Sequence, residues 1–394
     1  MKPINESSGS VVQRAVAPAW AVLAVTWLGS IGTAVGWSGV FFITEAAYGF
    51  EEESNLVLGA GLGLIYAISA LVAGPLVTRL IDAKPGLSRR AVLATVCIGM
   101  GGAAMIPAFT PAVWAIWVFA GIFITLQGLM WPLVEAYLSG GRRGKAMRSI
   151  TGRFNIVWAS AIVLAMWGMA GFMETQPRVI LGLLGVAMFA TAGLLAWFPR
   201  EPAPHVEVAE VEHEIDPQRA IKLLRVFRVS LLGSYALHAA LTPLLPHLLG
   251  EMGLSESEKT PFASIWMASR LGMFVLLERW HGWHGRWRTV WWACGLMLAG
   301  FVVCALAPVA ADLSNNFNGL LWMGIGLAFL GAGIGAVYAA ALYYAMEAGP
   351  AAVESGGKHE GMIGLGYTAG PVMALVAAEM FGLFDGGTGI LPVQ

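Results

Sequence analysis

Ionisable side chains are scarce in the long apolar stretches of this sequence, and Arg270 is the most prominent of them. Thr260-Pro261 is typical of a helix N-cap followed by proline at the first helical position. At ~1.5 Å per residue, Arg270 would then lie ~14 Å along that helix, about half of a ~30 Å hydrocarbon core. His238 reaches a similar depth on the preceding stretch. A guanidinium at that depth could bind a carboxylate or phosphate bidentately.

Each of these two residues also has a purely structural interpretation. The donors of Arg270 could be taken up by carbonyl groups of a neighbouring helix, but the cost of inserting a charge into a membrane favours a functional role. For His238, a hydrogen-bonded core histidine is the favoured interpretation.

Polar and aromatic residues recur every three or four positions, which places them on one face of a helix. They form the series Thr26, Ser30, Thr33, Trp37; the series Gln127, Trp131, Glu135; and the series Ser234, His238, Thr242. Such faces either line a wet pathway or join helices within lipid. The first series leaves both possibilities open, whereas the bulk of Gln127 and Trp131 favours a pathway.

Charged residues also gather beside short loops. Glu135 and Arg153 flank the loop between two apolar stretches and are predicted to form an ion pair, which would be a conformational latch or an inert surface pair. At the corresponding inner end of the C-terminal half, the same alternatives stay open for Glu347, His359 and Glu360.

Composition identifies the class of protein: 57% of the residues are hydrophobic and 12% are charged, against roughly 25% charged in soluble domains. A net charge of -1 without a basic stripe argues against nucleic-acid binding. The sequence has no metal-ligand cluster, nucleotide-binding loop or activated nucleophile. We therefore expect no enzyme activity, no metal and no cofactor.

A helix needs about 20 apolar residues to cross the bilayer, and on that basis the sequence predicts eleven spans. They are 18–44, 55–78, 91–110, 112–138, 150–172, 178–198, 226–248, 261–278, 289–308, 318–346 and 359–382. The charged stretch 199–222 cannot bury apolar surface, so it is predicted to be a cytoplasmic linker between an N-terminal six-helix bundle (1–198) and a C-terminal bundle of five spans (223–394).

Basic residues fix the expected orientation. With the N-terminus inside, all but three of the 23 Lys and Arg residues fall on the cytoplasmic side, the exceptions being Arg178, Lys259 and Arg270. This asymmetry follows the positive-inside rule and predicts a multi-pass protein of a bacterial-type inner membrane.

The two halves repeat with a shift of about 208 residues, as in transporters built from parallel repeats. The same shift predicts a twelfth span near Asp385, where the sequence instead reads DGGTGILPVQ. We therefore expect that helix to be missing, through a shortened reading frame or as a natural variant.

This arrangement resembles the major facilitator superfamily over nearly the whole chain. The loop signature of that family is matched by Gly74, Leu76, Arg79, Arg89 and Arg90, with Thr78 at its acidic position, and again by Glu278, Arg279, Gly282 and Arg286. The resemblance implies a charge network containing Arg79, Arg90, Glu278 and Arg279. It also implies a central cavity lined by helices 1, 4, 7 and 10, the last of which contributes Tyr338.

These observations predict an all-α membrane protein of the major facilitator type that moves a small solute by alternating access, coupled to an ion or proton gradient. An anionic solute is favoured if Arg270 faces the cavity, and we expect a monomer. The alternatives are a non-transporting scaffold or sensor, and efflux of amphipathic compounds.

Overall fold

The computed structural model describes residues 15–142, 144–204, 216–348 and 353–380, and every regular element in these ranges is a helix. In chain order they are α1 (Ala19–Ala34), the π-helix η1 (Val35–Gly39), α2 (Val40–Tyr48), α3 (Glu52–Ala83), α4 (Arg89–Phe109), α5 (Val113–Ser139), α6 (Gly144–Met173), α7 (Val179–Leu194), η2 (Leu195–Trp197), α8 (Pro217–Leu241), α9 (Leu245–Glu251), α10 (Glu256–Ala263), α11 (Ile265–Arg279), η3 (His281–Trp283), α12 (Trp287–Leu313), α13 (Asn316–Ala348) and α14 (Val353–Met380).

Ten helical segments in the described residues are long and apolar enough to cross a membrane. They coincide with ten of the eleven spans predicted from the sequence. The remaining prediction, 226–248, falls on α8 and α9, which are separated at Thr242 and Pro243. The first turns of α8 carry Arg219, Lys222, Arg225 and Arg228, so this helix is more polar than the others. The predicted division into six and five spans stays a prediction.

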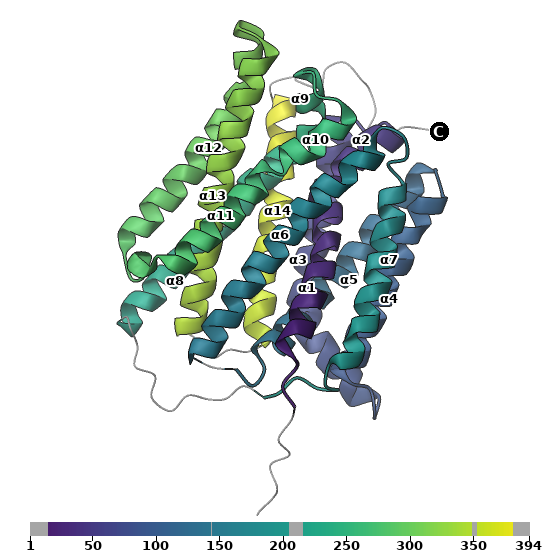
Figure 1. The fold of residues 1–394 in the computed structure, drawn as a ribbon, viewed down its shortest axis with the longest axis vertical. Helices are drawn as coiled ribbons and strands as arrows, with labels where there is room; N and C mark the ends of the chain where they lie inside the picture. The colour runs from purple at the N-terminus through teal and green to yellow at the C-terminus, as the bar shows by residue number, and fades with distance from the viewer. Residues whose placement is uncertain (1–14, 143, 205–215, 349–352, 381–394) are drawn as a thin grey trace, which may run out of the picture.

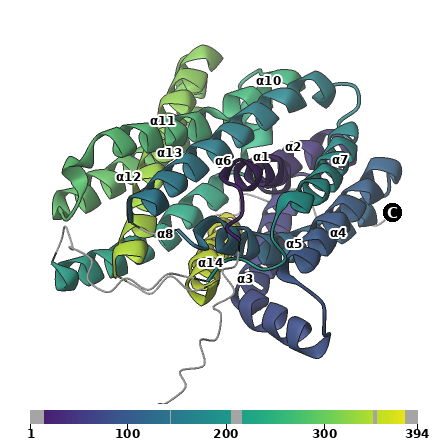
Figure 2. The ribbon, with the colours of Figure 1, turned by 60° about the horizontal axis from the view of Figure 1, so that its bottom comes forward.

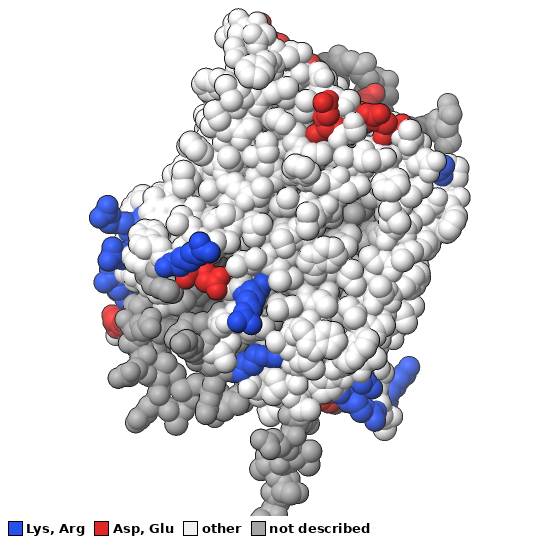
Figure 3. Space-filling view, in the orientation of Figure 1, with Lys and Arg blue, Asp and Glu red and all other residues white. Residues whose placement is uncertain are grey.

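The surface between the two ends of the molecule is apolar. Large hydrophobic side chains are exposed along outward faces, for example Leu64, Ile68 and Leu71 on α3 and Leu298, Val302 and Leu306 on α12. In Figure 3 the middle of this surface is almost free of charge, with mostly acidic side chains at the upper end and mostly basic side chains in the lower part. Exposed apolar belts of this size need lipid rather than water. We call the two ends the acidic end (Glu45, Glu52, Glu174, Glu256) and the basic end (Arg79, Arg89, Arg142, Arg200, Arg279).

Two groups of helices face each other across the centre of the molecule. We call residues 15–204 the N-half and residues 216–380 the C-half. In Figures 1 and 2, α4, α5 and α7 of the N-half lie on one side, whereas α8, α11, α12 and α13 of the C-half lie on the other. The halves meet where α3 packs on α14 and where α6 packs on α10 and α11.

Glycines let α3 and α14 approach each other closely. A Cβ added at Gly63 would overlap the backbone of Thr368, and one added at Gly364 would lie 2.6 Å from the backbone nitrogen of Ala67. Small residues at such crossings are typical of helix packing in membranes, where close backbone contact replaces the hydrophobic effect. On another face of α14, Gly366 and Gly370 make a similar approach to α8.

Two sequence-based boundaries differ from the structure, and a third prediction cannot be compared with it. The helix expected to start at Thr260-Pro261 begins at Glu256, because Ser255 and Glu258 form a capping box one turn earlier. The stretch predicted as linker is partly helical, since α8 begins at Pro217 with Asp216 as its cap. The end of the chain, where a twelfth span is expected to be missing, lies outside the described residues.

The α3–α14 contact gives a stability prediction. Gly63→Ala should lower the thermal midpoint of the purified protein, because the added methyl group meets backbone that cannot rotate away. Overpacking of this kind costs about 1–3 kcal/mol. Gly61, on the same helix, has nothing within 4 Å of an added Cβ, so Gly61→Ala is the matched control. Equal thermal midpoints for the two variants, measured by differential scanning fluorimetry in detergent, would contradict the packing argument.

Candidate functional site

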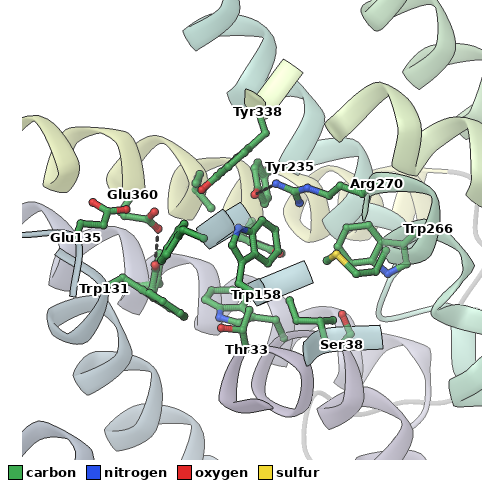
Figure 4. Close-up of a pocket in the computed structure, with 17 residues that line it drawn as sticks. Thr33, Ser38, Trp131, Glu135, Trp158, Tyr235, Trp266, Arg270, Tyr338 and Glu360 are labelled. Carbon is green, nitrogen blue, oxygen red and sulfur yellow. Dashed lines mark hydrogen bonds between the residues drawn. The ribbon is translucent and has the colours of Figure 1, made fainter. Parts of the chain in front are cut away.

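A cavity of about 80 Å³ lies between the N-half and the C-half (Figure 4). This volume can hold several water molecules or a small solute. Most of its walls are aromatic. The lining residues are Thr33, Trp37, Ser38, Tyr66, Trp131, Glu135, Phe154, Trp158 and Ile162 from the N-half, and Tyr235, Trp266, Met267, Arg270, Tyr338, Glu360, Ile363 and Tyr367 from the C-half.

Arg270 is 1% exposed and extends from α11 into this cavity. Its Nη2 donates a hydrogen bond to the Tyr235 hydroxyl at 2.9 Å, while its Nε has no partner among the described residues. The guanidinium carbon lies 4.7 Å from the ring centres of both Trp158 and Tyr338. Arg270 therefore faces the space between the halves as expected, but it is held by aromatic rings and Tyr235 instead of His238 or a polar residue of α1 or α5.

Gln127 positions the N-half wall of the cavity without lining it. Its Oε1 accepts a hydrogen bond from Trp37 Nε1 at 2.7 Å, and its Nε2 donates to Thr33 Oγ1 at 3.1 Å. Trp37 lies in η1, where the π-helical turn directs both Trp37 and Ser38 into the cavity. Trp37 in turn stacks on Tyr367 of the C-half with ring centres 4.1 Å apart. Of the polar series on the first helix, Thr26 and Ser30 bond only to their own backbone.

Two carboxyl groups, one from each half, line the part of the cavity remote from Arg270 (Figure 4). Glu360 on α14 accepts a hydrogen bond of 2.5 Å from the hydroxyl of Tyr66 on α3. Glu135 on α5 lies close enough to Glu360 for the two charges to interact. The latch predicted between Glu135 and Arg153 is wrong for this structure: Arg153 is exposed, and the described ion pairs do not include it. Helix α5 turns Glu135 inward, away from the loop that Arg153 follows.

His238 does not line the cavity. Its ring packs on Trp266 with ring centres 3.9 Å apart, and a ring nitrogen lies 3.2 Å from Thr242 Oγ1. These contacts satisfy a buried histidine and favour the structural interpretation. Tyr338 and Trp131, the other candidates from the sequence, both line the cavity.

The charge network expected at the basic end takes a different form. Arg79 and Arg279 are exposed, and Arg90 Nη1 donates to the carbonyl oxygen of Phe198 at 2.9 Å. The ion pair found there joins Arg89 to Glu201 at 2.6 Å. Glu278 approaches the other half instead, since a Cβ added at Gly152 would lie 3.0 Å from its Oε1. Five further cavity residues were not predicted from the sequence: Tyr66, Trp158, Tyr235, Trp266 and Tyr367. All but Tyr235 lie on helices outside the expected set, and Tyr235 lies beside the polar series of its helix and not in it.

The acidic end is closed by polar contacts that run from one half to the other. Lys259 Nζ is bound by Glu45 Oε1 at 2.8 Å from the N-half and by Glu256 Oε1 at 2.5 Å from its own helix. A side-chain contact of 2.9 Å joins His247 to Glu52. The hydroxyl of Ser257 donates to Glu174 at 2.6 Å. The halves are thus fastened together at the acidic end, with the cavity beneath.

The comparisons agree with this architecture. A sequence profile of the Major Facilitator Superfamily matches residues 27–378. No curated protein matches the sequence. Among solved structures, nucleoside transporter NupG superposes with a TM-score of 0.63 at 12% identity, covering 92% of this chain and 91% of that chain. A POT family transporter in complex with 5-aminolevulinic acid gives a TM-score of 0.64 at 10% identity, covering 93% and 91%.

Identities this low show a shared fold and no more. The profile, however, covers nearly all of the described chain, so the family assignment does not depend on the structural likeness alone. The protein therefore belongs to the Major Facilitator Superfamily and is a membrane transporter, not an enzyme.

Proposed function

We propose that this protein is a secondary active transporter that moves a small anionic solute by alternating access, driven by a proton or substrate gradient. The proposal rests mainly on the cavity between the halves, in which the buried guanidinium of Arg270 has one N–H group without a partner among the described residues. A charge at such depth is costly, and charged residues inside membrane helices typically mark the pathway of a substrate or an ion. Guanidinium pairs with carboxylate and phosphate in a fork geometry that few other groups match.

The contacts between the halves are the basis of the conformational change that we propose. At the acidic end they are ion pairs and hydrogen bonds, which can break singly. Around the cavity they are ring contacts that can slide, such as Trp37 on Tyr367, together with the hydrogen bond from Tyr66 to Glu360. We propose that breaking the acidic-end contacts lets the halves rock about the α3–α14 crossing and expose the cavity to that side. The positive-inside rule makes the basic end cytoplasmic in this proposal.

Transport itself is tested with the purified protein in proteoliposomes. A panel of radiolabelled carboxylates, phosphates, amino acids and nucleosides is offered with and without a pH gradient. The proposal predicts saturable uptake of at least one anionic or anion-bearing solute. Uptake of none of them by protein that unfolds cooperatively would favour the non-transporting scaffold. Uptake restricted to neutral or cationic amphipathic compounds would favour the efflux alternative.

Arg270→Gln should weaken the interaction with the transported anion about 10- to 100-fold, since a hydrogen bond to a charged group is worth ~1.5–3 kcal/mol. The measurement is competition by unlabelled solute during uptake. Arg279→Gln, the same change at the exposed end of the same helix, is the control and should leave competition unchanged.

Because the buried Nε of Arg270 lacks a partner, Arg270→Gln should unfold at the same or a higher temperature than the parent. If Arg270→Gln bound the transported anion as tightly as the parent does, Arg270 would not be the residue that binds the anion.

Glu45→Gln should loosen the acidic end, because it removes the carboxylate that reaches Lys259 from the other half. A Ser38→Cys reporter in the cavity, in a protein whose native Cys97, Cys294 and Cys304 are replaced by alanine, should react about tenfold faster with a membrane-impermeant thiol reagent added on that side. A factor of ten corresponds to ~1.4 kcal/mol.

The matched control is Glu256→Gln, which removes the carboxylate that contacts Lys259 from the same helix. This change alters the charge around Lys259 but cuts no link between the halves, so labelling of the reporter should stay near the parental rate. Equal acceleration by both variants would mean that local charge, not the bridge between the halves, controls access.

A further inference from the structure

The cavity holds both signs of charge but keeps them apart. Arg270 projects from one wall, and Glu135 and Glu360 lie at the opposite part of the cavity (Figure 4). Among the described lining residues these three are the ones with an ionic side chain, and the remaining titratable groups are the tyrosines Tyr66, Tyr235, Tyr338 and Tyr367. The described ion pairs within 4.0 Å include none of the three.

Burying a guanidinium and two carboxyl groups apart from each other costs free energy that direct pairing would reduce. An ion buried away from water is tolerated when it is paired and hydrogen-bonded. Here the guanidinium donates one bond to a neutral phenol, and Glu360 accepts one from a neutral phenol. The cavity therefore offers two half-sites, a guanidinium and a pair of carboxyl groups, and neither has a partner of opposite charge within 4.0 Å among the described residues.

The carboxyl half-site is built from both halves of the chain, because Glu135 belongs to α5 and Glu360 to α14. Two carboxylates facing each other repel, and a positively charged group between them removes that repulsion. The aromatic wall favours the same kind of ligand. Trp131, Trp37 and Tyr66 line this region, and the faces of such rings attract ammonium groups.

We infer that the transported solute is a small zwitterion, whose carboxylate or phosphate group binds Arg270 and whose amine lies between Glu135 and Glu360. This inference rests on the proposed function and narrows its substrate class from anions to amino-acid-like solutes. Binding of the amine would join α5 to α14 across the cavity, while the anion would join both to α11. One ligand would thereby draw the two halves together on the side of the cavity that faces the basic end.

Binding is measured separately from transport, by quenching of tryptophan fluorescence in the full-length protein in detergent. The probes are matched series: glycine, 4-aminobutyrate, leucine, phenylalanine and phosphoethanolamine, each with the compound that lacks its amine and the compound that lacks its acid. At least one zwitterion should bind ten or more times more tightly than both of its single-charge partners. Equal or tighter binding by every amine-free acid would overturn the inference.

Substitutions test which residues of the cavity bind each charged group of the zwitterion. Glu135→Gln and Glu360→Gln should each reduce the preference for the zwitterion over its amine-free partner by tenfold or more, whereas Arg270→Gln should reduce the preference for the zwitterion over its acid-free partner. Glu278→Gln, a carboxylate outside this cavity, should change neither preference. The inference would also be overturned if both glutamate variants kept the parental preference for the zwitterion over its amine-free partner. This outcome counts only for variants with the parental thermal midpoint.

The two proposals fail in different ways. Uptake of amine-free acids into proteoliposomes, with no discrimination in favour of zwitterions, would contradict the zwitterion inference and leave transport standing. Selective binding of a zwitterion in detergent, with no uptake of that zwitterion into proteoliposomes, would support the paired half-sites and contradict transport.

Discussion

The guanidinium of Arg270 lies in the middle of an apolar molecule, enclosed by the rings of Trp158, Tyr338 and Tyr235, and it has no carboxylate to neutralise it. Lipid would not tolerate this charge, so the side chain can only face the space between the halves. That requirement explains why the cavity is lined with polarisable rings. On the other wall of the cavity, Gln127 holds Trp37 and Thr33 in place through two hydrogen bonds.

The contacts between the halves differ in kind along the length of the molecule. At the acidic end they are directional and charged, centred on Lys259, and they can be exchanged for water when the halves separate. Between α3 and α14 they are backbone contacts made possible by glycine, which resist separation but allow small rotations. Around the cavity they are ring contacts and the hydrogen bond from Tyr66 to Glu360. Alternating access requires three parts: a closure that can open, a crossing about which the halves can turn, and a site that can be exposed.

Much of the fold could be predicted from the sequence because lipid imposes a simple rule. Each span needs about 20 apolar residues, and ten of the predicted spans coincide with helices to within a few residues. The boundary at Thr260-Pro261 was wrong because a capping box at Ser255 outweighs a proline that α10 accommodates within its length. Arg270 could be proposed as a cavity residue from its type and depth, and Thr33, Trp37 and Trp131 from their spacing along a helix. Tyr338 followed from the family resemblance, whereas Glu360 was expected in a charge pair near the inner face and instead lines the cavity.

The rest of the site could not be predicted, because helix rotation is set by packing between helices and not by periodicity within one. Glu135 follows the same series as Gln127 and Trp131, yet the sequence does not say whether it turns toward Arg153 or toward Glu360. Tyr66 and Tyr367 look like ordinary core residues until α3 and α14 are brought together. The contact of Tyr66 with Glu360 joins residues that are far apart in the chain, and local sequence patterns do not predict such a pair.

The most direct test of the account is a pair of distance measurements by pulsed electron paramagnetic resonance on the protein in nanodiscs. One pair of spin labels replaces the exposed residues Gln176 and Asn315 at the acidic end, and the other replaces the exposed residues Lys84 and Arg288 at the basic end. Each pair is measured with and without Glu45→Gln. The account predicts that the substitution adds a longer distance at the acidic end together with a shorter distance at the basic end, because the halves rock as rigid bodies. A change at the acidic end with no change at the basic end would contradict it.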